Sequence, residues 1–86
     1  MKKKDPLDFS MYDIAYMEKI IKKHDMRPEV ARFIVLYSKG INDGLTVYWF
    51  LDRVTEYIVR FNPYDLERAK NLLEGFHHKY VIPFGR

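Results

Sequence analysis

The sequence of 86 residues contains no cysteine, so disulfide bonds and thiolate metal ligands are excluded. Small secreted domains usually depend on such cross-links, and their absence favours an intracellular, cytoplasmic protein. No apolar run approaches the ~20 residues that a membrane-spanning helix needs. The lysines at positions 2–4 are not followed by an apolar stretch, so we do not interpret the first residues as a signal peptide.

Residues that would carry catalysis are also scarce. The two serines, Ser10 and Ser38, lie where helix ends are expected, and neither Gly40 nor Gly44 is followed by the Lys-Ser/Thr of a phosphate-binding loop. No acid and base are paired in the pattern of a catalytic site. We therefore predict a non-enzymatic protein with no cofactor and no small-molecule substrate.

Aromatic residues, by contrast, are abundant: seven Tyr, six Phe and one Trp make up 16% of the chain. A chain of this length forms one domain, residues 1–86, because a second could not bury a core of its own. Its interior is too small to hold every ring, so some aromatic side chains are expected at the surface. Large surface aromatics often mark partner contacts. The composition therefore favours a homodimer or a protein partner.

Local signals predict an all-α fold, a compact bundle of about four short helices. The first helix begins after Ser10, which has the spacing of a capping box with Asp13, and runs to about Lys23. The second opens at Pro28, a residue suited to the first helical position because it lacks an N–H. Gly40 is the predicted C-terminal cap of this second helix.

The third and fourth helices are predicted from their apolar periodicity. Apolar residues recur at helical spacing through 47–61. The pair Asn62-Pro63 is expected to end the third helix and to begin the fourth, with Asn62 as the N-cap. We expect the fourth helix to continue through Gly75, because its apolar stripe reaches Tyr80 with spacings of three and four.

Two short segments flank the predicted bundle: residues 1–8 as a flexible charged arm and 81–86 as an apolar tail. An α+β fold with a hairpin at 33–51 is the alternative architecture, since this region is rich in β-branched and aromatic residues around a hairpin-like loop. The stripe at 47–61 follows a period of 3.6 and not of two, so the helical interpretation is preferred.

One candidate interface lies on the first helix. Tyr12, Tyr16 and Ile20 form an apolar stripe nearly opposite a second stripe on the same helix. A helix that is apolar on two sides is either central in the fold or covered by another chain. We therefore predict this stripe to contact a partner or a second copy.

A second candidate interface lies on the third helix, opposite its apolar stripe. Trp49 and Arg53 are spaced to stack as a cation–π pair, and Glu56 and Arg60 to form an ion pair. Trp and Arg are enriched in binding hot spots, which makes Trp49 and Arg53 candidate partner-binding residues. Trp49 is equally compatible with a position that completes the core.

Five basic residues cluster at the end of the first helix and the start of the second. They are Lys19, Lys22, Lys23, Arg27 and Arg32. Phosphate contacts by such residues add salt-sensitive affinity for nucleic acid. Lysines at a helix C-terminus also complement the helix dipole and promote solubility, which is the interpretation we prefer.

The histidines do not form a predicted metal site. Glu74 and His78 are four residues apart and share a helix face, but adjacent His77 points about 100° away. His24 would have to arrive from elsewhere in the fold. We predict no bound metal.

The sequence thus predicts a small non-enzymatic interaction protein, such as an adaptor, inhibitor or regulator. It would dock an aromatic helical surface on a protein partner or on itself, with no membrane partner. The alternative function is a nucleic-acid-binding regulator that uses the five-residue basic cluster.

Overall fold

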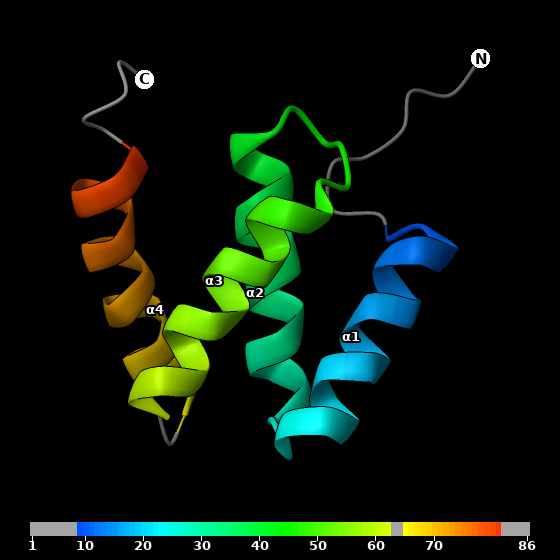
Figure 1. The fold of residues 1–86 in the computed structure, drawn as a ribbon, viewed down its shortest axis with the longest axis horizontal. Coiled ribbons are helices and arrows are strands. Elements are labelled where there is room, and N and C mark those ends of the chain that lie inside the picture. Colours follow the sequence, from blue (N-terminus) through cyan, green and yellow to red (C-terminus); the bar gives the residue numbers. More distant parts are fainter. Residues whose placement is uncertain (1–8, 63–64, 82–86) are drawn as a thin grey trace.

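The computed structural model describes residues 9–62 and 65–81, and these two stretches contain helices and turns but no strand (Figure 1). Four α-helices follow in order, α1 (Met11–His24), α2 (Pro28–Ile41), α3 (Tyr48–Phe61) and α4 (Leu66–Phe76), and a π-helical turn, η1 (His77–Val81), continues α4. The predicted all-α bundle is confirmed. The alternative hairpin at 33–51 is wrong, because this region forms most of α2, a turn and the start of α3. None of the helices in the described stretches is long and apolar enough to span a membrane.

The N-terminus of α1 is the predicted capping box. The Asp13 N–H donates to Ser10 Oγ at 3.2 Å, and the Ser10 N–H donates to Asp13 Oδ2 at 3.0 Å. These two bonds satisfy N–H groups that have no partner inside the helix. At the other end, Asp25 closes α1 in a left-handed conformation with φ of 52°.

The second helix begins at Pro28 as predicted, but it does not end at Gly40. Gly40 lies within the last turn of α2, and Asn42 is the C-cap. The side-chain amide of Asn42 donates at 2.8 Å to the backbone carbonyl four residues earlier. The left-handed conformations that Gly favours occur later, at Asp43 (φ 57°) and Gly44 (φ 82°), where the chain turns toward α3.

Asn62 ends α3 but does not begin α4. It adopts φ of 46°, and its N–H donates to the Ile58 carbonyl at 2.9 Å, which is a C-cap arrangement. The N-cap of α4 is Asp65, whose carboxylate accepts a hydrogen bond from the Arg68 N–H at 2.9 Å. The prediction was wrong because Asn suits both positions, as an N-cap acceptor and as a left-handed C-cap.

Some predicted features lie outside the described residues. They are the helical start at Pro63, the charged arm at 1–8, and the apolar tail beyond Val81. Val81 itself is buried, so the one described residue of the tail packs onto the bundle.

The second helix is central in the fold. Figure 1 shows α1 and α4 on opposite sides of the molecule with α2 and α3 between them, and α2 packs against all three other α-helices. Its Ala31, Ile34 and Val35 have no exposed surface. Among the residues that the structure describes, the buried apolar ones are Tyr16, Ile20, Val30, Ala31, Ile34, Val35, Phe50, Leu51, Val54, Ile58, Ala69, Leu73, Phe76 and Val81.

A buried ion pair joins α1 to α2. Asp13 is fully buried and Lys39 is 4% exposed, with Lys39 Nζ 2.8 Å from Asp13 Oδ2. Thr46, in the turn before α3, donates its hydroxyl to Asp13 Oδ1 at 2.7 Å. Burial alone would raise the pKa of Asp13, but the hydrogen bonds from Lys39, the Ser10 N–H and Thr46, with the charge of Lys39, hold it below the usual value. One carboxylate therefore caps α1 and ties it to α2 and to the turn.

Candidate functional site

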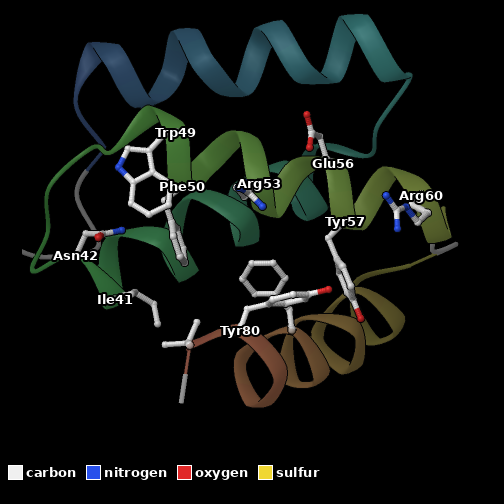
Figure 2. Close-up of a pocket in the computed structure, with 11 residues that line it drawn as sticks. Ile41, Asn42, Trp49, Phe50, Arg53, Glu56, Tyr57, Arg60 and Tyr80 are labelled. Atoms are coloured by element: carbon white, nitrogen blue, oxygen red, sulfur yellow. The ribbon is translucent and has the colours of Figure 1, made fainter. Parts of the chain in front are cut away.

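A groove lies between α3 on one side and α4 with η1 on the other (Figure 2). Its volume is about 640 Å³, which is within the range typical of ligand-binding pockets. The end of α2 closes it at one end. The residues that line it are Ile41, Asn42, Trp49, Phe50, Arg53, Glu56, Tyr57, Arg60, Phe76, Tyr80 and Val81.

Helical spacing on α3 places its residues along the groove. Trp49, Arg53, Glu56 and Arg60 recur at intervals of four, three and four, so they follow one side of the helix through three turns. In Figure 2, Phe50 and Tyr57 point from α3 toward α4, whereas Glu56 points to the opposite side. The groove is therefore aromatic inside and charged along the α3 edge.

Phe76 is the centre of the aromatic interior. Its ring centroid lies 5.2 Å from that of Tyr57, 5.0 Å from that of Tyr80 and 6.1 Å from that of Phe50. The contacts with Tyr57 and Phe50 are edge-to-face, a geometry worth about 0.5–1.5 kcal/mol beyond the buried area. Phe76 is buried, whereas Tyr80 is 42% exposed. The rings thus form a packed floor with one partly open wall.

The π-helical turn η1 supplies that open wall. The chain continues as a helix through Gly75, as predicted, but it widens from His77 onward. The Tyr37 hydroxyl and His77 Nδ1 are 3.0 Å apart and form a hydrogen bond that ties the start of η1 to α2. Burial raises the pKa of Tyr37 to about 12, so it keeps its hydroxyl proton at neutral pH. π-Helical turns occur frequently at functional sites, and this one carries Tyr80 and Val81 into the groove.

Trp49, Arg53 and Arg60 lie on the edge of the groove, and their side chains are exposed to solvent. Trp49 is 68% exposed, and its ring contacts Phe50 edge-on with centroids 5.8 Å apart. Arg53 and Arg60 are exposed, and within the described residues neither forms an ion pair. Among the described residues, Arg53 does not lie over the Trp49 ring and Arg60 forms no ion pair with Glu56, so both predicted pairings are wrong. Trp49 does not complete the core.

The apolar stripe predicted as an interface on α1 is mostly internal. Tyr16 is 3% exposed and Ile20 is 2% exposed, while Tyr12 remains at the surface. The Tyr16 hydroxyl lies 2.9 Å from both Asp52 Oδ1 and Thr55 Oγ1 on α3. Burial, followed by the nearby carboxylates, raises the pKa of Tyr16 above its usual value despite the Thr55 hydrogen bond. The expectation that Tyr16 and Ile20 face a partner is corrected: they face α2 and α3 because this side of α1 packs onto the core.

The predicted basic cluster is exposed, but three of its members have partners within the chain. Lys19 lies over the Tyr16 ring at 5.0 Å, and Arg32 lies over the Phe9 ring at 5.5 Å. Arg27 is 3.6 Å from Glu29 in a solvent-exposed ion pair. The remaining two members are the exposed residues Lys22 and Lys23 in the last turn of α1.

The histidines do not gather with other ligands. The described residues include no group of three or more His, Asp and Glu side chains placed to hold a metal ion. His77 Nδ1 instead forms a hydrogen bond with the Tyr37 hydroxyl.

Several groove residues were not identified as site residues from the sequence. In the sequence, nothing distinguishes Tyr57, Phe76 and Tyr80 from the residues of an ordinary buried stripe. The available signal was the apolar periodicity that continues past Gly75 to Tyr80, one turn beyond the buried part of α4. Sequence spacing does not show that α4 and α3 leave a gap there.

Comparison with protein-family models, with curated proteins and with solved structures finds no match for this chain.

Proposed function

We propose that this is a small non-enzymatic interaction protein that binds a protein partner in the groove between α3 and α4–η1. The observation that carries the proposal is the position of Trp49, which is 68% exposed on the edge of an aromatic groove. A large apolar side chain at such a position gains stability only when another surface covers it. Covering a side chain of this size is worth on the order of 1.5–3 kcal/mol.

The composition of the groove supports a protein ligand. Interfaces are enriched in Tyr, Trp, Phe and Arg, and hot spots especially in Trp, Tyr and Arg. The groove contains one Trp, two Tyr, two Phe and two Arg among its eleven lining residues. Its charged edge and apolar floor match the polar rim and apolar centre of a binding surface.

Self-association through a different surface is the competing form of this proposal. Met11, Tyr12, Leu45 and Tyr48 are all about half exposed or more near the start of α1 and the turn before α3. The groove is preferred because it is a hollow that can receive side chains of a partner. The cysteine-free composition supports a cytoplasmic location for the protein.

Selection from a displayed library of random peptides against the immobilised full-length protein tests the proposal. Selected peptides without tryptophan are titrated into the protein while the emission of Trp49, its only tryptophan, is recorded. We expect a blue shift when a peptide binds the wild type. Trp49→Ala lacks this fluorophore, so affinities of the variants and the wild type are compared by isothermal titration calorimetry; Trp49→Ala should lose about 30-fold in affinity, the size of a hot-spot truncation. Tyr12→Ala removes an equally exposed aromatic on α1 and serves as the matched control.

The two variants separate the two surfaces. If the affinity for the selected peptides falls in Tyr12→Ala and not in Trp49→Ala, the binding surface lies on α1 and not in the groove. If no selected peptide depends on Trp49, the groove is not a peptide-binding surface.

A further inference from the structure

We infer that the groove receives an amphipathic α-helix of the partner whose apolar face is bordered by acidic residues. This inference rests on the proposed function and specifies the ligand of the same site. It is carried by the shape of the groove, by its aromatic floor and by two arginines on its edge that form no ion pair with any described residue.

The shape of the groove suits a helix. Figure 1 shows α3 and α4 close together where they are joined and farther apart toward the other end of α4. The lining residues of α3 extend from Trp49 to Arg60, about 16 Å at 1.5 Å of rise per residue, which is the length of three helical turns. Rows of side chains spaced by three and four form the ridges against which another helix packs.

Other backbone conformations fit less well. Addition of a strand needs a free sheet edge, and the described residues form no strand. A polyproline helix also docks in aromatic-lined grooves, but its prolines supply no acidic group for the two arginines on the edge of this one. A helix fills such a hollow with side chains at positions i, i+3 or i+4, and i+7.

The charges on the edge point to acidic residues on the ligand. Arg53 and Arg60 are seven residues apart, two turns along the same side of α3, and neither has an ion-pair partner among the described residues. Acidic residues seven apart on a docked helix would meet both guanidinium groups.

The same edge disfavours a nucleic acid. Glu56 lies between Arg53 and Arg60 among the residues of α3 that line the groove, so a carboxylate interrupts the positive charge of this edge. A continuous phosphate backbone would pass this carboxylate, whereas individual acidic side chains of a helix meet the arginines one at a time. Nucleic acid is therefore an outcome of the test and not the proposed ligand.

The test is a selection from two displayed libraries against the full-length protein, one of stapled helices of about 20 residues and one of linear peptides that includes proline-rich sequences. The helix library should yield binders with an apolar stripe of spacing three and four and with Glu or Asp beside it, and these should shift the Trp49 emission to the blue. Their affinity should fall about tenfold in Arg53→Glu/Arg60→Glu, the combined effect of two lost and two reversed exposed charge pairs. The matched control Lys22→Glu/Lys23→Glu changes two exposed charges on α1 and should bind normally.

A second selection against Arg53→Glu/Arg60→Glu should yield helices with Lys or Arg at the positions that were acidic. Circular dichroism verifies that each variant is folded, which is expected because all four substituted side chains are exposed. Fluorescence titrations with single-stranded RNA and DNA complete the experiment.

The outcomes distinguish this inference from the proposed function. Trp49-dependent binders that are proline-rich, extended or without acidic residues would overturn the helix inference and leave the proposed function standing. Binding of RNA or DNA that requires Trp49, Arg53 and Arg60, in the absence of peptide binders, would overturn both. The absence of any Trp49-dependent peptide from either library would also overturn both.

Discussion

Replacement of Lys39 by Met should strongly destabilise the protein, because it leaves the Asp13 carboxylate buried without its counter-ion. The Lys39 Nζ–Asp13 Oδ2 distance is 2.8 Å, and the two side chains are 5% and 0% exposed. Removing one partner of such a pair costs about 3–5 kcal/mol. An 86-residue domain has about 4–13 kcal/mol of stability in total, so the loss is roughly a quarter of it or more. A loss of 3 kcal/mol corresponds to a Tm lower by about 12–24 °C.

The assay is urea unfolding followed by far-UV circular dichroism, with Lys22→Met as the matched control. Lys22 is exposed in the last turn of α1, and its replacement should change the free energy of unfolding by less than about 0.5 kcal/mol. A loss of less than about 1 kcal/mol for Lys39→Met would refute the reasoning, because the carboxylate would then have found water or another donor.

The pH dependence of stability is a second, independent test of the Asp13–Lys39 pairing. In the wild-type protein the pKa of Asp13 lies below its usual value of 3.8, so the ion pair stabilises the fold above that value and is lost as the pH falls below it. In Lys39→Met, burial without a counter-ion should raise the pKa of Asp13 above the unfolded value. The ionised Asp13 carboxylate then destabilises the variant instead of stabilising it. Lowering the pH toward 4 should therefore reduce the difference in stability between the variant and the wild type.

Four further predictions follow from particular contacts. Gly40→Ala should stabilise the protein by about 0.5–1 kcal/mol in urea unfolding, since a Cβ at Gly40 inside α2 meets no atom within 4 Å; Gly44→Ala should destabilise it, because Gly44 has φ of 82°. Tyr16→Phe should lower the free energy of unfolding by about 1–3 kcal/mol, because it leaves the Thr55 hydroxyl buried without this partner. The double variant Tyr16→Phe/Thr55→Val should recover much of this stability, and equal instability of the two variants would contradict the hydrogen-bond account. The burial of Tyr37 should make stability fall as the pH rises from 10 toward 12, a loss that Tyr37→Phe should reduce in alkaline unfolding. Replacement of the five basic residues of the cluster by Ala should leave any binding of labelled RNA or DNA in a salt series unchanged, and a steep fall would establish the cluster as a phosphate-contacting surface.

The sequence determined the helices because the signals that start and sustain a helix are local. The Ser10–Asp13 capping box, Pro28 at the start of α2 and the apolar period of α3 act over a few residues, and each occurs where it was predicted. Helix ends were less certain for a physical reason. Asn62 can serve as an N-cap or a left-handed C-cap, and Gly40 can cap a helix or lie within it, so neither residue decides by itself where a helix stops.

The orientation of α1 was decided only by tertiary packing. Its two apolar stripes are equivalent in the sequence, and the contact with α2 and α3 buries Tyr16 and Ile20 while Ile14 stays 45% exposed. The pairing of Asp13 with Lys39 is likewise invisible to local reasoning, because 26 residues separate the two charges. A charged residue is predicted to be exposed when only the sequence is considered. The counter-ion 2.8 Å away offsets the free-energy cost of burying this one.

The groove is the clearest property of the tertiary structure. The sequence supplied its aromatic and basic residues, and it identified Trp49 and Arg53 as candidates. It did not show that α4 and its π-helical turn would diverge from α3, because the angle between two helices depends on how their side chains interdigitate along the whole contact. That angle separates Tyr80 from Trp49 and leaves about 640 Å³ between residues that would otherwise have closed the core.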